Sequence, residues 1–486
     1  MQEALLKVVA TINSYLTDYV LIFLLVGVGL YFTVRTKFVQ VRCFGEGMKN
    51  VFGKISLKGG SQKGGLSSFQ ALATAIAAQV GTGNIVGACG AILIGGPGAI
   101  FWMWVIAFLG MATIYAEATL AQKTKKVNAD GTVEGGPVYY IKTAFKGKFG
   151  KFLAVFFAVA TMLALGFMGS MVQSNSIAGT MGKAFSIGES FYWIVGIVVA
   201  ALAAVVFLGG VNRLASVTEK IVPIMALLYI LGSLVVIFAR IQYVPETFGM
   251  IFKYAFNATA LIGGGIGYAL KSAISQGAKR GLFSNEAGMG STPHAHAQAN
   301  VKNAHEQGTT AMIGVFIDTF IVLTMTALVV ISTLYAGGGP LGNPATYTMA
   351  GALDAFPKAN LAQMAFGEVF GDTFGSIFVA ICLFFFAFST ILSWNFFGKI
   401  NFQYLFGKKY TVVYTVIAVV FVFLGSIFSN DLVWELTDFF NYLMVLPNVI
   451  ALVALGSLVV TAVKEGKAEK AEAALSLKAA KENTEE

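Results

Sequence analysis

Gln79-Val80-Gly81-Thr82-Gly83-Asn84 lies inside the apolar run from Leu66 to Leu93 and decides how the rest of the chain is interpreted. A glycine costs about 1 kcal/mol in a helix interior, and this stretch places two of them among polar side chains. Backbone groups released by unwinding find no water at membrane depth, so irregular backbone persists there only where it lines a cavity or binds a ligand. The stretch therefore predicts a broken transmembrane helix that holds a substrate. The alternative is a continuous helix whose small residues let another helix pack closely.

The composition excludes an ordinary soluble domain. Hydrophobic residues make up 57% of the 486 residues and charged residues 12%, whereas a typical soluble domain is about 25% charged. The net charge of +9 comes mostly from short loops between apolar runs, where Lys and Arg indicate topology and no nucleic-acid site. Cys43, Cys89 and Cys382 are single and widely spaced, so we expect them to be reduced.

Eleven apolar runs approach the ~20 residues that a helix needs to cross a bilayer. They fall at about residues 17–34, 68–95, 98–121, 152–180, 191–210, 218–239, 266–291, 310–335, 372–398, 411–428 and 432–462. Basic residues gather after the first and third runs, so these two segments should be cytoplasmic. We therefore expect a multi-pass protein of the cell membrane with its N-terminus outside and its C-terminus in the cytoplasm.

A second broken helix is expected, because transporters built from inverted repeats interrupt corresponding helices in their two halves. Two stretches qualify, Gly263-Gly264-Gly265-Ile266-Gly267 and the run from Ser284 to Ser291 that contains Glu286. The first lies at the outer end of its apolar run and is most simply a turn. We favour the second, with Glu286 at mid-membrane, and the alternative places Glu286 in the inner loop.

Two halves of five runs each follow from these breaks. They give an all-α polytopic membrane protein, a five-plus-five inverted repeat with one extra N-terminal helix. The expected segments are 1–65 (extracellular N-terminus, accessory helix and cytoplasmic linker), 66–240 (first repeat), 241–463 (second repeat with outer lid segments) and 464–486 (charged cytoplasmic tail). Half-helix N-termini suit a carboxylate, and half-helix C-termini offer carbonyls to a cation. A zwitterionic amino acid together with Na⁺ satisfies both ends.

Three motifs resemble the alanine or glycine:cation symporter family. They are Ala77-Ala78-Gln79-Val80-Gly81-Thr82-Gly83-Asn84-Ile85, Arg280-Gly281-Leu282-Phe283-Ser284-Asn285-Glu286-Ala287-Gly288-Met289-Gly290-Ser291 and Ser393-Trp394-Asn395. The resemblance spans nearly the whole chain. It implies a leucine-transporter-like fold and sodium-coupled uptake of alanine or glycine. The motifs leave open sodium against proton and alanine against glycine.

The resemblance also implies particular site residues. Oxygen donors for a sodium ion would come from Ala77, Val80, Ala387, Ser389 and Thr390. The substrate would be bound by Gln79, Val80, Gly81, Thr82, Gly83, Asn84, Gln173, Phe283, Asn285, Glu286, Gly288 and Trp394. Four of these residues have plain structural alternatives. Thr390 can bond to its own preceding turn, Gln173 can join helices, and Trp394 and Phe283 can simply pack.

Other ionisable residues receive structural interpretations. Asp318 lies in an apolar span, where an acid is a functional candidate, but we expect it to pair with Lys279 or Arg280. Glu117 falls near the inner end of its span, where snorkelling to water is easy. The three histidines, His294, His296 and His305, are expected in an inner loop without nearby acids or cysteines, so metal binding is not expected.

The function expected is secondary active transport, the sodium-coupled symport of alanine or glycine into the cell by alternating access. The alternative is a proton-coupled carrier of small amino acids or, less readily, a channel. A channel would need a water-filled path lined by polar rings, whereas the polar residues here gather at paired breaks. An ATP-driven pump would need a phosphate-binding glycine loop followed by Lys and Ser or Thr. We expect no enzyme, no nucleic-acid partner and a functional monomer.

Overall fold

The computed structural model describes residues 2–53, 66–256, 266–342 and 358–485. This part of the chain is almost entirely helical. Its one sheet has two antiparallel strands, β1 (Lys126–Val127) and β2 (Val133–Glu134). All three cysteines are free and buried, as expected for reduced thiols.

By the predicted division of the chain, the helices form an N-terminal group and two halves. The N-terminal group is α1 (Gln2–Leu16), η1 (Thr17–Leu21), α2 (Ile22–Arg35), α3 (Val39–Arg42) and α4 (Phe44–Phe52). The first half is α5 (Ser68–Gln79), η2 (Gly83–Gly87), α6 (Ala88–Gly95), α7 (Ala99–Thr124), α8 (Pro137–Ala144), α9 (Gly147–Thr161), η3 (Met162–Gly169), α10 (Ser170–Phe185), η4 (Glu189–Phe191), α11 (Tyr192–Leu208), α12 (Gly210–Ala239) and η5 (Ile241–Tyr243). The second half is α13 (Val244–Phe256), α14 (Ile266–Asn285), α15 (Pro293–Gln298), α16 (Ala304–Val315), η7 (Phe316–Leu323), α17 (Thr324–Leu334), η8 (Ala336–Gly338), η9 (Lys358–Asn360), α19 (Leu361–Phe370), α20 (Asp372–Phe406), η10 (Lys408–Tyr410), α21 (Thr411–Gly425), α22 (Asn430–Ala454) and α23 (Gly456–Glu485).

Among the described residues, nine helical stretches are long and apolar enough to span a membrane, or ten with the bent pair α5 and η2–α6 counted as one. The remaining predicted run, the seventh at 266–291, contains α14, which is helical but carries Lys271, Lys279 and Arg280 and is less apolar than the others. The first spanning stretch, Glu3–Arg35, begins well before the predicted residue 17. With that helix outside the repeats, the bundle has the predicted five-plus-five arrangement.

The first helix of the first half is broken where the sequence predicts. Ser67 begins α5 with a capping box, in which it and Gln70 satisfy each other's backbone N–H groups. Val80 leaves the helix at φ −79° and ψ 86°. Helix resumes at Gly83 as the π-helical turn η2, and the two pieces are bent by 45°. The alternative of a continuous helix is therefore wrong.

The first helix of the second half is broken as well. It stops at Asn285, the end of α14, and α15 begins at Pro293. The backbone between them has positive φ at Glu286 (59°), Gly288 (93°) and Gly290 (77°), which glycine adopts freely but which costs a residue such as glutamate on the order of 1–3 kcal/mol. The competing glycine cluster at 263–267 lies outside the described residues except for its last two positions.

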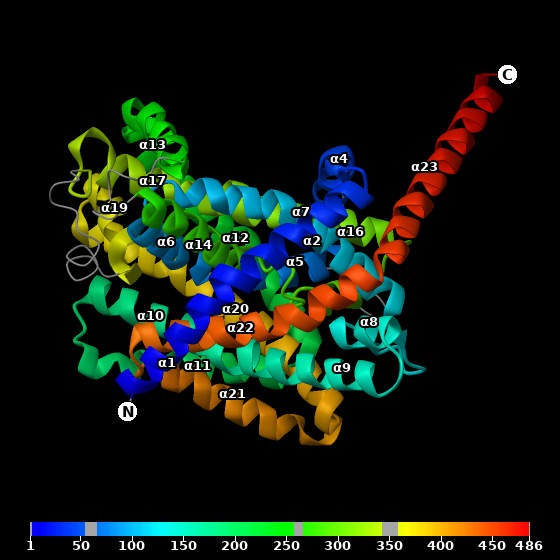
Figure 1. The fold of residues 1–486 in the computed structure, drawn as a ribbon, viewed down its shortest axis with the longest axis horizontal. Coiled ribbons are helices and arrows are strands. Elements are labelled where there is room, and N and C mark those ends of the chain that lie inside the picture. The colour runs from blue at the N-terminus through cyan, green and yellow to red at the C-terminus, as the bar shows by residue number, and fades with distance from the viewer. Residues whose placement is uncertain (1, 54–65, 257–265, 343–357, 486) are drawn as a thin grey trace.

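The helices run between two ends of the molecule (Figure 1). The N-terminus, α13 and α19 lie at the left end in this view, and α4, α8 and the C-terminus lie at the right end, from which α23 projects. The chain termini are therefore at opposite ends of the bundle, as the predicted topology requires. The described parts of the predicted outer lid segments contain the short helices α13 and α19, while residues 257–265 and 343–357 lie outside the described residues. The action of these segments as lids stays a prediction.

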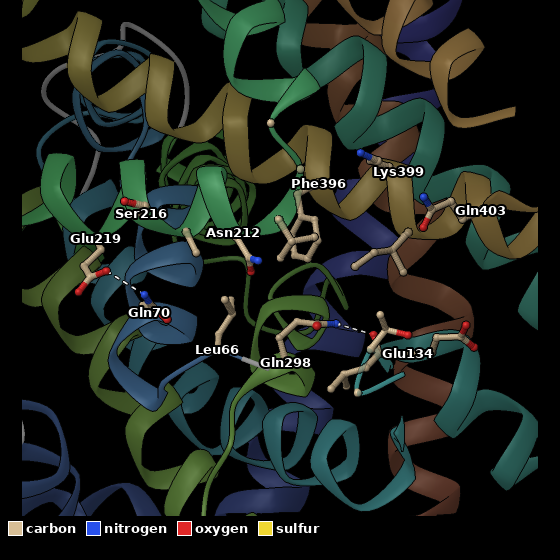
Figure 2. A pocket seen from close by; sticks show the side chains of 18 of the residues that line it. Leu66, Gln70, Glu134, Asn212, Ser216, Glu219, Gln298, Phe396, Lys399 and Gln403 are labelled. Carbon is tan, nitrogen blue, oxygen red and sulfur yellow. Dashed lines mark hydrogen bonds between the residues drawn. The ribbon is translucent and has the colours of Figure 1, made fainter. Parts of the chain in front are cut away.

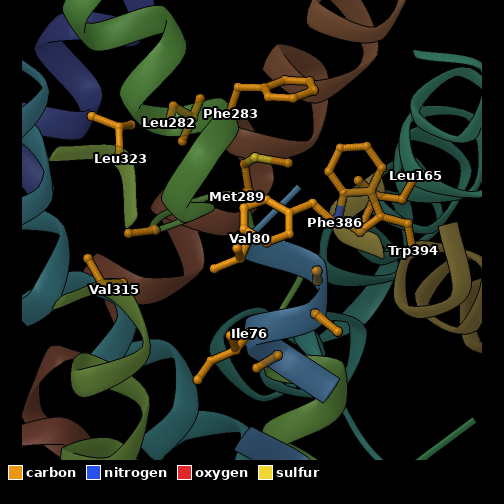
Figure 3. Close-up of a cluster of buried hydrophobic side chains, with 14 of the residues drawn as sticks. Ile76, Val80, Leu165, Leu282, Phe283, Met289, Val315, Leu323, Phe386 and Trp394 are labelled. Carbon is orange, nitrogen blue, oxygen red and sulfur yellow. The ribbon is translucent and has the colours of Figure 1, made fainter. Parts of the chain in front are cut away.

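Buried apolar side chains surround the first break (Figure 3). Ile76 and Val80 come from the end of α5, and Met289 comes from the second break. Phe386 and Trp394 come from α20. All five are less than a tenth exposed. The two interruptions therefore share one apolar core without water, in which polar groups can find hydrogen-bond partners only among other protein groups or a ligand.

Candidate functional site

Two hydroxyl groups of α20 lie against the carboxyl end of α5. Thr390 Oγ1 is 2.8 Å and Ser389 Oγ is 3.4 Å from the carbonyl oxygen of Ala77. The same hydroxyls lie 3.0 and 2.9 Å from the carbonyl oxygen of Phe386 in their own helix, so the structural alternative for Thr390 is also available. The last carbonyls of a helix have no partner within it. This corner of the site is therefore rich in hard oxygen atoms, and all of these residues are buried.

The first break is held in shape by side-chain oxygens. The amide of Gly81 donates to Asn84 Oδ1 at 2.9 Å, and the amide of Thr82 donates to Gln173 Oε1 at 3.2 Å. Gln173 comes from α10 and is fully buried. The structure thus brings Gln173 to the unwound turn, where the resemblance places it.

Three buried polar atoms at this break have no hydrogen-bond partner among the described residues. They are Gln79 Oε1, Thr82 Oγ1 and Gln173 Nε2. Leaving a buried polar atom unpaired costs about 1–3 kcal/mol. An acceptor, a hydroxyl and a donor at one unwound turn therefore indicate a place for a polar ligand.

Glycine is required at two positions because other helices approach the break closely. A Cβ atom on Gly81 would lie 2.4 Å from Thr390 Oγ1, and one on Gly83 would lie 3.0 Å from the Cα atom of Ser284. The glycines that unwind the helix thus also let α20 and α14 reach it. Because of these close contacts, the predicted sodium donors, the first break and the second break lie next to one another.

Asp318 connects the two breaks. Its carboxylate accepts a hydrogen bond from Asn84 Nδ2 at 2.6 Å and from Ser284 Oγ at 3.0 Å, and the hydroxyl of Thr319 donates to it at 2.7 Å. The residue is fully buried in the π-helical turn η7, and π-helical turns are frequent at functional sites. The expected pairing of Asp318 with a basic residue is therefore wrong.

The basic residues of α14 pair instead with α22. Lys279 lies 2.8 Å from Asp438 and 3.2 Å from Glu435, and Arg280 lies 3.3 Å from Asp438. The guanidinium of Arg280 also stacks on Trp434. Asp438 and Glu435 thus neutralise these charges, and Asp318 has only neutral donors among the described residues.

Glu286 sits at the second break with its carboxylate directed to α20. It accepts hydrogen bonds from Trp394 Nε1 and Ser291 Oγ, and it is fully buried. Among the described residues no basic side chain pairs with it. Phe283 packs edge to face on Trp394 with ring centroids 5.6 Å apart. A buried carboxylate beside an aromatic wall is left without a positive partner.

Glu117 supports the second break, and the prediction that it snorkels to water is wrong. Its carboxylate accepts the amides of Gly288 at 3.1 Å and Gly290 at 2.9 Å and the side-chain amide of Asn448 at 2.7 Å. It is completely buried in α7. Nothing local in the sequence marks this contact, because the glutamate and the glycines are far apart in the chain.

The histidines are not in a solvated loop. His294 and His296 are buried in α15 and hydrogen-bond to Asn401 and Gln307 respectively. His305 lies in the first turn of α16, and its Nε2 is 3.1 Å from Glu46 Oε2. The expectation that no acid or cysteine lies near these histidines is therefore wrong, since Cys43 lies close as well.

A cavity of about 1490 Å³ opens beside the start of α5 (Figure 2). Its walls come from α5, α12, α20, the end of α15 and the hairpin of β1 and β2. Leu66 and Gln298 lie on one side, and Phe396 and Lys399 lie across from them. The lining residues of α20, from Phe396 to Tyr404, lie at the end of this helix that is predicted to be cytoplasmic.

Comparisons with known proteins agree with this architecture. Residues 2–479 match the sodium:alanine symporter family. The chain is 40% identical over 465 residues to the sodium/alanine symporter AgcS of Methanococcus maripaludis, which covers 94% of this chain and 96% of that one. It is 39% identical over 467 residues to a putative sodium/proton-dependent alanine carrier, YrbD, of Bacillus subtilis, with 95% and 92% covered. The solved structure of MhsT in complex with L-phenylalanine superposes with a TM-score of 0.56 at 14% identity over 83% of this chain and 96% of that one. The likeness to MhsT shows a shared leucine-transporter-like fold.

Proposed function

Since the chain belongs to the sodium:alanine symporter family, and is thus a secondary transporter of the plasma membrane and not an enzyme, we propose that it carries alanine or glycine into the cell together with Na⁺ by alternating access. The topology that we propose has the N-terminus outside and the C-terminus inside. A single chain suffices, because both breaks and all of their supporting side chains belong to one bundle.

The observation that carries this proposal is the group of unpaired polar atoms on Gln79, Thr82 and Gln173. In the bound state the amide nitrogen of Gln173 donates to the substrate carboxylate, beside the positive end of the half-helix that begins at Gly83. The substrate ammonium faces Glu286, the carboxylate that lacks a positive partner. A zwitterion thus satisfies groups that the protein alone leaves unpaired.

Sodium is the coupling ion that the oxygen donors favour. Carbonyls of unwound helix ends commonly coordinate Na⁺ in transporters of this kind, and Ala77 O with the hydroxyls of Ser389 and Thr390 forms such a group. The carbonyls of Val80 and Ala387 complete the proposed set, and both residues are buried. The cavity in Figure 2 then serves as the path by which ion and substrate leave to the cytoplasm.

We expect Thr390→Val to raise the Na⁺ concentration for half-maximal alanine uptake by at least roughly tenfold, because one oxygen bonded to a charged group contributes about 1.5–3 kcal/mol. Valine keeps the shape of threonine and removes only the hydroxyl. The measurement is alanine uptake into proteoliposomes as a function of Na⁺. Thr415→Val is the matched control, since Thr415 bonds only within α21. Uptake by the unaltered protein that a pH gradient drives equally well without Na⁺ would contradict sodium coupling.

Proton coupling is the second candidate, and the buried carboxylates of Asp318 and Glu286 favour it. Neither has a basic partner among the described residues, and a buried acid in a membrane helix can carry a proton. The uptake measurement separates the two ions, because a proton-coupled carrier would respond to the pH gradient and ignore Na⁺.

The aromatic wall of the site should restrict substrate size. Phe283 and Trp394 pack together, and a Cβ atom on Gly169 would lie 2.3 Å from the Trp394 ring, so this wall has no room to retreat. Leucine and phenylalanine should therefore compete with labelled alanine roughly fivefold to a hundredfold less well than glycine does, since overpacking costs about 1–3 kcal/mol. Phe283→Ala should admit leucine. Equal displacement of alanine by leucine and glycine in the unaltered protein would refute the pocket.

A further inference from the structure

A thiol, a carboxylate and an imidazole meet at the end of the bundle that is predicted to be cytoplasmic. Cys43 lies between α3 and α4, Glu46 lies in the first turn of α4, and His305 lies in the first turn of α16. Their ligand atoms all lie within 4.8 Å of one another. The side chains of His305 and Glu46 are only 3% and 15% exposed, and Cys43 is 8% exposed. None of the three residues belongs to the two helix breaks or to the proposed transport site.

The imidazole of His305 is already oriented for binding. The hydroxyl of Tyr115 lies 2.6 Å from Nδ1, and Nε2 faces Glu46 at 3.1 Å. Metal-bound histidines almost always use their second ring nitrogen to hydrogen-bond an oxygen atom, which fixes the tautomer and the ring plane. Tyr115 is buried and supplies that oxygen.

A lysine from the C-terminal helix competes for the same carboxylate. Lys470 of α23 lies 2.5 Å from Glu46 Oε2 and is 57% exposed. An ion pair with so exposed a lysine contributes little stability, so a cation bound more tightly can displace it. In the structure the Lys470 ammonium thus lies against the carboxylate where a metal cation would bind.

We propose that Cys43, Glu46 and His305 form a binding site for a zinc-class divalent cation, which displaces Lys470 from Glu46. One thiolate, one imidazole and one carboxylate are ligands that Zn²⁺ accepts together, and water fills the fourth tetrahedral position. A sulfur ligand favours zinc over hard cations such as Na⁺ or Mg²⁺. The Cys43 thiol releases its proton to solvent when the metal binds.

The test is a titration of the purified full-length protein with Zn²⁺ in the presence of a chromophoric chelator, repeated with Co²⁺ to detect thiolate ligation by absorption. One ion per chain is expected. Cys43→Ser should weaken binding more than about tenfold and remove the cobalt–thiolate band, since even outer partners of a metal site are worth 10–100-fold. Cys382→Ser is the matched control, because this thiol is buried elsewhere in α20, and it should leave binding unchanged.

Lys470→Ala gives a second and opposite expectation. Removing the competing cation should tighten zinc binding by about two- to fivefold, the range of an exposed ion pair. Lys470 is on the surface, so this variant does not endanger folding. Weaker binding in Lys470→Ala, zinc binding that is the same in Cys43→Ser, or no stoichiometric zinc in the unaltered protein would each overturn the proposal and leave an ion-pair cluster that anchors α23. Alanine uptake is not used in this test, so its result does not depend on the proposed transport function.

Discussion

Asp318→Ala should lower alanine uptake more than a hundredfold, because hydrogen bonds to a buried charged group contribute about 1.5–3 kcal/mol each and at least two are lost. The substitution removes the hydrogen-bond acceptor of the Asn84 side-chain amide in the first break and of the Ser284 hydroxyl at the second. Both breaks then lose the group that holds them in register. Uptake into proteoliposomes, normalised to the amount of folded protein, is the measurement.

Two further variants make the expectation specific. Asp318→Asn keeps one acceptor oxygen and should retain more uptake than alanine does. Asp372→Ala removes an exposed acid at the start of α20 and should change nothing. If Asp318→Ala transports as well as the unaltered protein, the link between the breaks has no role in transport.

Glu286→Gln is expected to weaken alanine binding by at least tenfold. Removing one partner of a buried, hydrogen-bonded charge pair typically costs about 2–5 kcal/mol, and glutamine keeps the size of the side chain and its contacts with Trp394 and Ser291 while removing the charge. Binding of labelled alanine to the purified protein measures the effect. Glu368→Gln, on an exposed position of α19, is the matched control.

A cysteine at position 286 tests the same assignment by accessibility. The natural cysteines are buried, so a thiol reagent should report chiefly on the new one. Alanine should protect it from the reagent. Ready labelling from the cytoplasmic side with or without alanine, together with normal affinity in Glu286→Gln, would move the substrate site away from this residue.

Both helix breaks could be predicted from sequence because their causes are local. Glycines two residues apart beside Thr82 and Asn84 cannot continue a buried helix cheaply, and α5 ends at Gln79. The run around Gly288 and Gly290 has the same texture, and positive φ values occur at those two glycines. A conformational preference of the backbone is set by a few neighbouring residues, so it can be predicted from a single sequence.

The side chains that support the breaks could not be predicted, because their partners are distant in sequence. Asn84 meets Asp318 across 234 residues, and Glu117 meets Gly288 across 171. Apolar patterns place helices in the bilayer but do not say which faces meet. The acids of α22, which include Asp438, were as available to Arg280 as Asp318 was, and only the packing of α14 decides between them.

The start of α5 and the end of α15 are tied by two backbone hydrogen bonds, from Leu66 N to Gln298 O and from Asn300 N to Leu66 O, each 2.9 Å long. These are the half-helices of the two broken helices that border the cavity. If one of them swung away alone, both bonds would break at a net cost of about 1 kcal/mol each, whereas a joint movement breaks neither. The proposed ion donors lie at the end of one half-helix, and the second break precedes the other. Under the proposed function, a joint movement would therefore release ion and amino acid in the same step, which would keep their stoichiometry fixed and disfavour slippage, the passage of one without the other.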